Sequence, residues 1–304
     1  MSRWRLVADV GGTNVRFARA DADGNLAAVR SEATATAASF AQALARYLAA
    51  TGGTEDCAAC AIGAAGPVDD GRVTLTNLDW TIARDAVAAT LGGVPVVIVN
   101  DLEAVASALP HLAPGDSAPF GGPRNDTVAR RAMLAVNVGT GFGAALAVRH
   151  DELWWTLPGE AGHMTLGTVG VEEAQLLAQG GTVEDLLSGN GLSTLYARLT
   201  GEPLPAAEVI ARAAEYELAY RAVEIATTVL GRVAGDLALA TGAESVFLTG
   251  SVALGLAQVA EPAGFRAAFE AKGPMRARMQ GIPTSVVTRD HVSLLGLAMR
   301  PIGS

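Results

Sequence analysis

Two glycine turns that carry a threonine follow strand-like apolar runs in distant parts of the chain. The first is Gly11-Gly12-Thr13-Asn14, after residues 6–10, and the second is Gly139-Thr140-Gly141, after residues 134–138. Glycine lets backbone N–H groups converge on an anion, because it accepts positive φ and has no Cβ. Taken alone, the first turn is more typical of a plain β-hairpin, and it lacks the lysine of a Walker P-loop. Together they favour a site that grips one polyphosphate from two sides.

Two acidic residues stand at the ends of expected strands. Asp9 is the second-last residue of the first apolar run, just before the first glycine turn. It is placed to hold Mg²⁺ through water, since hard cations prefer oxygen ligands. Asn100-Asp101 follows the apolar run 94–99, before a helix expected to begin near Glu103. A carboxylate there can accept a proton from a substrate hydroxyl. Aspartate is also a preferred helix cap, and the capping and catalytic interpretations of Asp101 are compatible.

The segment Pro158-Gly159-Glu160-Ala161-Gly162-His163 contains a proline and two glycines, which exclude a regular helix. A fixed loop that offers the carboxylate of Glu160 and the imidazole of His163 suits neighbouring hydroxyls of a sugar, which need directional acceptors and donors. A buried structural turn explains the segment equally well. Glu184 could add another acceptor for a sugar, although a solvated helix residue is the commoner interpretation of a lone glutamate.

Three further features can be interpreted as structural or as functional. Gly250-Ser251, at the end of an expected strand, could let an adenine ring lie flat on the backbone, or could be a simple turn. Trp154-Trp155 could stack on a sugar, but adjacent tryptophans in an alternating strand are more often core residues. Cys57 and Cys60 form a C-x-x-C pair that a strand follows instead of a helix, and no other cysteine completes a zinc site. We interpret both cysteines as structural.

Composition bounds the class of protein. A chain of 304 residues exceeds the usual size of one domain, so two domains are expected. With 50% hydrophobic and 17% charged residues it can bury a large core. The net charge of −9 argues against a nucleic-acid partner, because phosphate backbones need a basic face. No apolar run is long enough for a membrane span and no secretory signal is apparent, so a cytoplasmic protein without a membrane partner is expected.

The first hundred residues alternate strand and helix patterns, which predicts a sheet that mixes antiparallel hairpins with parallel crossovers. Residues 112–131 are rich in proline and glycine and predict an irregular connection, either a domain linker or a mobile lip of a cleft. We expect strands at 4–10, 15–20, 60–65, 94–99, 245–249 and 284–288, and helices at 39–50 (capped by Ser39), 83–91 and 293–299. After the second glycine turn the pattern is mostly helical, with long amphipathic stretches at 171–179 and 206–241.

Taken in order, these segments resemble the bacterial glucokinases of the hexokinase–actin superfamily over nearly the whole chain. The segments that carry the resemblance are LVADVGGTNVRFA, GPVDDGRVTLTNLDWTI, VNDLEAVASALP, NVGTGFGAA, LPGEAGHMTL, LLSGNGLSTLY, VFLTGSVA and GFRAAFEAKGPM. Three positions differ from the family pattern. Asn137 stands where glycine is more common, Asn190 interrupts the usual Ser-Gly-Pro-Gly, and Ser251 replaces the second glycine of the adenosine motif.

The resemblance implies an α/β protein with two domains of the actin/hexokinase-like (ribonuclease H-like) fold around a central cleft. Residues 1–111, completed by a C-terminal helix within 290–304, would form a small domain, and residues 112–289 a large one. The implied reaction is the ATP- and Mg²⁺-dependent phosphorylation of glucose at its 6-hydroxyl. A homodimer is also implied.

The resemblance also implies a role for each candidate residue. Asp101 would be the base on the 6-hydroxyl, and Asp9 would help to place Mg²⁺. The residues implied to bind the sugar are Asn100, Asp101, Glu160, His163 and Glu184. Those implied to bind the nucleotide are Gly11, Gly12, Thr13, Asn14, Gly139, Thr140, Gly141, Gly250 and Ser251.

Three other interpretations compete with glucose phosphorylation. The acceptor could be another hexose, such as mannose, fructose or an amino sugar. A non-catalytic sugar sensor could use the same scaffold, but Asp101 and both glycine turns would then have no purpose. An actin-like filament ATPase would leave the loop 158–163 unexplained.

Overall fold

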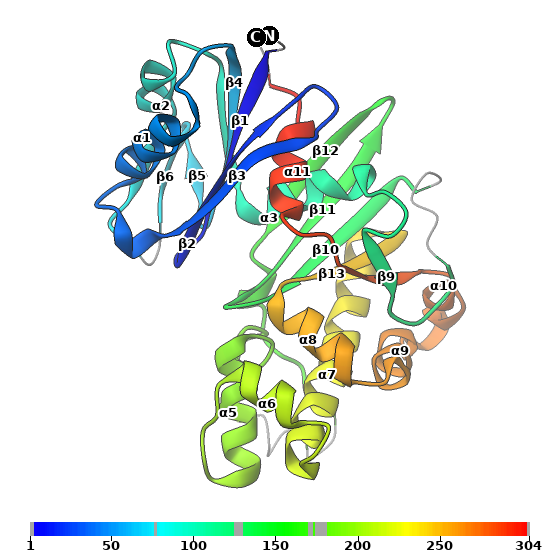
Figure 1. Ribbon diagram of the computed structural model, residues 1–304. Helices are drawn as coiled ribbons and strands as arrows, with labels where there is room; N and C mark the ends of the chain where they lie inside the picture. The colour runs from blue at the N-terminus through cyan, green and yellow to red at the C-terminus, as the bar shows by residue number, and fades with distance from the viewer. Residues whose placement is uncertain (1–2, 76–77, 125–129, 170–172, 174–180, 303–304) are drawn as a thin grey trace. The chain divides into compact units, whose positions relative to one another are not determined.

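The computed structural model describes residues 3–75, 78–124, 130–169, 173 and 181–302 (Figure 1). The chain forms two compact units. Unit 1 contains residues 1–111 and 290–304, and unit 2 contains residues 112–289. Each unit is a mixed β-sheet with helices packed against it. No helix in the described residues combines the length and hydropathy that a membrane span requires.

The main sheet of unit 1 has the strand order β3-β2-β1-β4-β8. Strands β1 and β2, and β2 and β3, pair as antiparallel hairpins, whereas β1, β4 and β8 run parallel. This confirms the expected mixture of hairpins and crossovers. The strands are β1 (Trp4–Val10), β2 (Asn14–Ala20), β3 (Leu26–Ala33), β4 (Cys57–Ala64) and β8 (Val96–Asn100), and a second small sheet contains β5 (Val68–Asp69), β6 (Arg72–Thr74) and β7 (Thr81–Ala83).

Helices cover both faces of the unit 1 sheet, because its central strands are apolar on both sides. In β1, Leu6 packs in one core cluster with Phe40 of α1, while its neighbour Val7 packs in another with Leu294 of α11. Ser39 caps α1 as expected, accepting a hydrogen bond from the N–H of Gln42. The helices are η1 (Thr34–Thr36), α1 (Phe40–Thr51), α2 (Arg84–Thr90), α3 (Asp101–Ala108), η2 (Leu109–His111) and α11 (Val292–Met299).

The C-terminal helix α11 holds α3, the helix that begins at Asp101. At Gly296 the two helices approach so closely that a Cβ would overlap the carbonyl oxygen of Ala104. Just beyond α11, Arg300 binds the carboxylate of Glu103 at 2.6 Å and the hydroxyl of Ser107 at 3.2 Å. The position of α3 therefore depends on residues nearly two hundred positions later in the chain.

The sheet of unit 2 has the strand order β12-β11-β10-β13-β14-β9, with β10, β13 and β14 parallel. Its strands are β9 (Ser117–Pro119), β10 (Ala132–Val138), β11 (Phe142–His150), β12 (Leu153–Gly159), β13 (Ser245–Thr249) and β14 (Thr284–Val287). Its helices include η4 (Ala161–His163), α5 (Gly189–Thr200), α6 (Ala206–Arg212), α7 (Glu217–Thr241), α8 (Ser251–Val259), α9 (Pro262–Glu270), η5 (Gly273–Met275) and α10 (Arg276–Gln280).

Unit 2 corrects two expectations drawn from the sequence. After the second glycine turn the described residues are mostly helical, as expected, but strand β11, which comes directly after the turn, was not expected. Residues 142–147 are all buried, so they show neither the period of a strand nor that of a surface helix. The stretch 206–241 is two helices, α6 and α7, and Val209 of α6 and Val223 of α7 pack in the same core. No glycine or proline between the two helices marks the break in the sequence. The expected helix 171–179 lies outside the described residues, except for Glu173.

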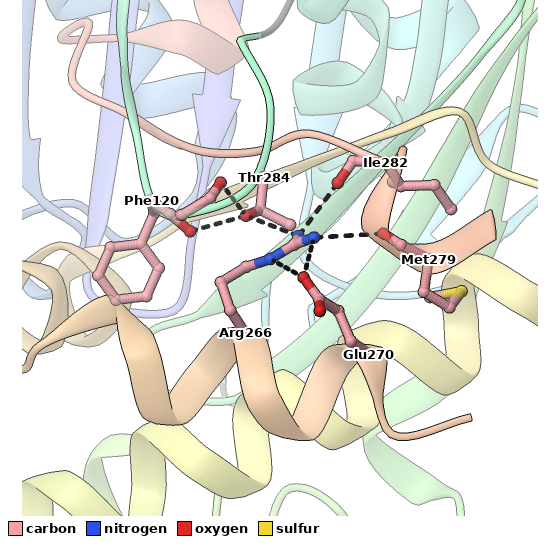
Figure 2. A network of polar contacts seen from close by, with 7 residues as sticks. Phe120, Arg266, Glu270, Met279, Ile282 and Thr284 are labelled. Carbon is pink, nitrogen blue, oxygen red and sulfur yellow. Dashed lines mark hydrogen bonds and ion pairs between the residues drawn. The ribbon is translucent and has the colours of Figure 1, made fainter. Parts of the chain in front are cut away.

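Arg266 of α9 joins four segments of unit 2 (Figure 2). The residue is only 8% exposed, and its guanidinium lies against the ring of Phe269. It donates hydrogen bonds to the carboxylate of Glu270, the carbonyls of Met279 and Ile282, and the hydroxyl of Thr284. Thr284 in turn donates to the carbonyl of Phe120 at 2.7 Å. The network therefore ties α9 to α10, to β14 and to the chain after β9.

Replacing Arg266 by methionine should lower the free energy of unfolding by about 3 kcal/mol, because the partly buried Glu270 would be left as a charge without its partner. The double variant Arg266→Met with Glu270→Leu should recover part of this loss. Urea unfolding of the three proteins measures both effects. Equal midpoints for the single and double variants would show that the ion pair is not the source of the stability.

Substituting Gly296 by alanine should destabilise unit 1 by about 1–3 kcal/mol, because the added methyl group forces α11 and α3 apart. Gly264→Ala in α9 is the matched control, since a Cβ there meets only the hydroxyl of Thr228 at 3.2 Å. Thermal and urea unfolding of both variants compare the two positions. A Gly296→Ala protein as stable as wild type would contradict the close approach of the helices.

Candidate active site

The first glycine turn connects β1 to β2 and is braced from one side. The N–H of Gly11 donates to the carbonyl of Asn14 at 2.9 Å. Thr34 of η1 binds the carbonyls of Gly12, through its hydroxyl, and of Thr13, through its N–H, both at 2.9 Å. In a trans peptide the N–H points away from the carbonyl, so the N–H of Thr13 points away from Thr34. The turn is therefore a hairpin in which the N–H of Thr13 is directed away from Thr34.

Asp9 lies in β1 and is 14% exposed. Its Oδ2 atom accepts hydrogen bonds from Nη1 of Arg16 at 3.2 Å and from the hydroxyl of Ser293 at 2.8 Å. These two contacts orient the carboxylate. Ser293 was not singled out from the sequence, because it lies 284 positions away and only the packing of α11 brings it to β1.

Asn100 and Asp101 lie at the junction of β8 and α3. Asn100 is extended, and its Oδ1 atom accepts the N–H of Leu102 at 2.9 Å, which makes it the N-cap of α3. Asp101 is the first helical residue, and its Oδ1 accepts the same N–H at 2.9 Å. The expected cap, Asp101 before a helix at Glu103, was therefore wrong by one position. The cap must have non-helical backbone angles, which Asn100 has.

The register of the unit 1 sheet relates this junction to the first glycine turn. Val10 of β1 pairs with Ala64 of β4, and Ala64 pairs with Asn100 of β8. Gly11 and Asp101 each follow this row by one residue. The glycine turn and Asp101 thus stand at the same edge of the sheet, two strand spacings or about 10 Å apart. The carboxyl ends of parallel strands are the usual ligand-binding edge of α/β proteins.

The second glycine turn connects β10 to β11 and is held on several sides. The N–H of Gly139 donates to the carbonyl of Gly141 at 2.9 Å, and Gly189 donates to the carbonyl of Gly139 at 2.9 Å. The N–H of Phe142 donates to Oε2 of Glu184 at 2.7 Å. Thr140, at the tip, is exposed. The turn is again a hairpin whose shape is set by other segments.

A neighbouring strand brings Gly250 and Ser251 to the same edge. Strand β13 runs parallel to β10, with Thr249 paired to Asn137, and its hydroxyl donates to Oδ1 of Asn137 at 3.3 Å. Gly250 follows β13, and Ser251 is the first residue of α8. Asn137 differs from the family pattern, and here its side chain links the two strands that carry these turns.

The segment 158–163 is a tight loop with a buried middle. Ala161 and Gly162 are buried in η4, whereas Glu160 and His163 on either side are exposed. The loop pairs with the chain around Glu184, whose N–H donates to the carbonyl of Gly162 at 3.0 Å. It is therefore a structural turn that also presents two polar side chains. Glu184 is partly buried in a turn before α5, so its interpretation as a solvated helix residue was wrong.

Asp185 was overlooked in the sequence. Its carboxylate accepts hydrogen bonds from the N–H of Thr182 at 2.7 Å and from its hydroxyl at 2.9 Å. These bonds lower the pKa of Asp185, and His163 lowers it further by a smaller amount. The Thr-x-x-Asp spacing, which resembles a capping box, was the signal available. Asp185 places a negative charge near His163.

Thr140 of the second glycine turn is one of the residues that line a pocket of about 580 Å³. The lining of this pocket has a polar part, which we call the polar wall (Thr140, Gly189, Asn190 and Ser193), and an apolar part, which we call the apolar wall (Pro203, Leu204, Pro205 and Ala206). Ser188 shapes the polar wall by capping α5, accepting the N–H of Gly191 at 3.0 Å. Gly250 and Ser251 are not among the lining residues.

The tryptophan pair and the cysteine pair noted in the sequence are not among the residues of the glycine turns, the loop 158–163 or the pocket. Trp155 is 62% exposed on the edge strand β12, so its interpretation as a core residue was wrong. Cys57 and Cys60 are buried in β4 as free thiols, and burial raises the pKa of both. A raised thiol pKa disfavours the reactive thiolate, which agrees with a structural role.

Comparison with known proteins identifies the family. The glucokinase family model matches residues 6–301. The glucokinase of Nitrobacter hamburgensis is 34% identical, over 99% of this chain and 98% of its own length. The crystal structure of a glucokinase from an Antarctic psychrotroph has a TM-score of 0.82 at 28% identity, with 98% of each chain covered. A ROK family glucokinase from Streptomyces griseus, in complex with glucose and AMPPNP, has a TM-score of 0.69 at 21% identity, over 97% of this chain and 98% of its own.

These matches confirm two predictions from the sequence. The α/β fold with two mixed sheets is that of the glucokinase structures. The order of the motifs indicated the bacterial glucokinases, and the family model covers nearly the whole chain. The chain belongs to the glucokinase family and is an enzyme of that family.

Proposed function

We propose that the protein transfers the γ-phosphoryl group of ATP to the 6-hydroxyl of glucose, giving glucose 6-phosphate and ADP. The observation that carries the proposal is the row Val10, Ala64 and Asn100 across three parallel strands. This row supports a phosphate at the first glycine turn and an attacking hydroxyl beside Asp101, both reached from one edge of the unit 1 sheet. The names of the family and of its relatives support glucose as the acceptor.

Asp101 acts as the base on the 6-hydroxyl in this proposal. Phosphoryl transfer asks the protein mainly for positioning and for stabilisation of charge. Orientation of the hydroxyl contributes about 7–11 kcal/mol, and a positioned base adds a factor of about 10²–10⁴ in rate. The shared hydrogen bond from Leu102 and the packing of α3 against α11 support a fixed position for this carboxylate.

Four residues bind the remaining sugar hydroxyls in this proposal. Oδ1 of Asn100 is used as the helix cap, so its amide nitrogen is the group that donates to the sugar. Glu160 and His163 stand exposed on either side of a buried turn, and Glu184 lies beside that turn. A hexose that lacks a matching hydroxyl leaves such polar groups unpaired, which is the source of specificity between sugars.

The nucleotide is held by both glycine turns. Gly11, Gly12, Thr13 and Asn14 bind phosphate in unit 1, and Gly139, Thr140 and Gly141 bind it in unit 2. We assign the nucleoside to the pocket that Thr140 helps to line, because it joins a polar wall near the phosphates to an apolar wall. Gly250 and Ser251 complete the nucleotide site, and the start of α8 at Ser251 favours an anion.

Mg²⁺ would be placed through Asp9. Within the described residues no group of three or more His, Cys, Asp or Glu could form a metal cage. One carboxylate fits Mg²⁺, which keeps several waters and binds substrate phosphates rather than dedicated protein cages. When bound with ATP, Mg²⁺ neutralises charge on the phosphates. Arg16 and Ser293 orient Asp9 for this role through its Oδ2 atom.

The protein also forms a homodimer in this proposal, as the resemblance to the family implies. Leu153, Trp155 and Leu157 alternate along the edge strand β12 and are 55%, 62% and 60% exposed, so they form one apolar stripe. The stripe is symmetric about Trp155. A two-fold axis at this residue would bring Leu153 against Leu157 of the partner subunit, as a self-complementary interface requires.

Asp101→Asn should lower kcat by a factor of about 10²–10⁴ while the dissociation constant for glucose changes little, because the amide still accepts the N–H of Leu102 but cannot take a proton. A coupled ADP assay with a panel of hexoses, and a fluorescence titration with glucose, measure the two quantities. Asp85→Asn, at an exposed aspartate in the first turn of α2, is the matched control. A variant that keeps most of its kcat would exclude Asp101 as the base.

Trp155→Ser should convert the dimer to a monomer, because it removes the centre of the apolar stripe. Size-exclusion chromatography with light scattering measures the mass of each protein. Tyr216→Ser removes an aromatic residue that is 57% exposed elsewhere in unit 2 and should leave the dimer intact. A dimer that survives Trp155→Ser, or a wild-type monomer, would refute this interface.

A further inference from the structure

Glu184 makes two contacts that a residue serving only the sugar would not need. Its Oε2 atom accepts the N–H of Phe142, at the end of the second glycine turn, at 2.7 Å. Its own N–H donates to the carbonyl of Gly162, in the loop that carries Glu160 and His163, at 3.0 Å. One residue therefore joins the turn assigned to phosphate with the loop assigned to the sugar.

The carboxylate of Glu184 lies directly against the glycine turn. A Cβ on Gly141 would stand 2.5 Å from Oε2, so only glycine permits this approach. The peptide between Gly141 and Phe142 is held on both sides, since its carbonyl accepts the N–H of Gly139 and its N–H donates to Glu184. This carboxylate is thus one of the contacts that set the orientation of the turn, which includes the exposed Thr140.

Packing alone does not explain the carboxylate at this position. The neighbouring Val183, Leu186 and Leu187 are buried and anchor the segment in the core, whereas Glu184 is only partly buried. A hydrogen bond to a charged acceptor is stronger than one between neutral groups, so the contact with Phe142 restrains the turn more than a neutral partner would.

We propose that Glu184 is a positioning residue for the nucleotide as well as a ligand of the sugar. Its Oε2 holds the second glycine turn in the shape that binds phosphate, and its Oε1 accepts a sugar hydroxyl. This inference rests on the proposed function. Because one carboxylate serves both ligands, a bound sugar that orders Glu184 raises the affinity for nucleotide, and the nucleotide raises the affinity for sugar by the same factor.

The two roles separate when nucleotide binding is measured without sugar. Glu184→Ala should raise the dissociation constant of Mg·AMPPNP about tenfold in the absence of glucose, because the N–H of Phe142 loses its acceptor. Glu184→Gln keeps an oxygen for this N–H but loses the charge, so its nucleotide dissociation constant should rise by less, about threefold. Both variants should bind glucose at least about tenfold more weakly, because the sugar loses its acceptor.

Isothermal titration calorimetry of the full chain with Mg·AMPPNP, with and without glucose, measures these constants. His163→Ala is the matched control, because it removes a sugar contact from the adjoining loop and should leave nucleotide binding without sugar unchanged. Thermal unfolding of each variant checks that it is folded.

The outcomes separate this inference from the proposed function. Nucleotide binding by Glu184→Ala as tight as wild type, or equally weakened in the Ala and Gln variants, would overturn the positioning role. Equal weakening in His163→Ala would also overturn it, since any change in the loop would then suffice. A wild-type protein that does not bind Mg·AMPPNP would refute the proposed function, and the inference with it.

Discussion

The parallel pairing of β1, β4 and β8 is the constraint on which the candidate site in unit 1 depends. It brings together residues that are ninety positions apart in the chain, because Val10, Ala64 and Asn100 share one row of the sheet. The glycine turn and Asp101 leave the sheet from that row. A shift of one residue in register would reverse the face of every side chain, so the apolar cores on both faces also protect the geometry of the site.

In both units, a segment outside the hairpin holds the backbone of the glycine turn. A turn that binds an anion must keep its N–H groups outward, although a hairpin loop is free to adopt several shapes. In unit 1 the carbonyls of the turn are bound by Thr34, and in unit 2 the first carbonyl is bound by Gly189. In each case a segment outside the hairpin removes the conformational freedom of the turn. The conformational entropy of the turn is therefore lost when the protein folds and need not be lost when a ligand binds.

Sequence patterns predicted most elements whose apolar residues follow a clear period or end at a recognisable cap. Helix α1 begins after Ser39 as expected, and strand β13 has the expected bounds. Strand β11 was missed because its first six residues are all buried and show no period, and the break between α6 and α7 was missed because no breaker residue marks it. Packing against the core determined both strand β11 and the break between α6 and α7, and a short stretch of sequence does not show such packing.

The sequence by itself determined the order of the motifs and the residue types at the ends of strands, because these are local, and the resemblance of those motifs to the bacterial glucokinases indicated the family. Only the tertiary structure decided which partner each of these residues meets. Glu184 reaches Phe142 across 42 positions and Ser293 reaches Asp9 across 284. Asn100 rather than Asp101 became the cap because β8 extends to position 100. Such contacts arise from the register of sheets and the docking of helices, which a single stretch of chain does not contain.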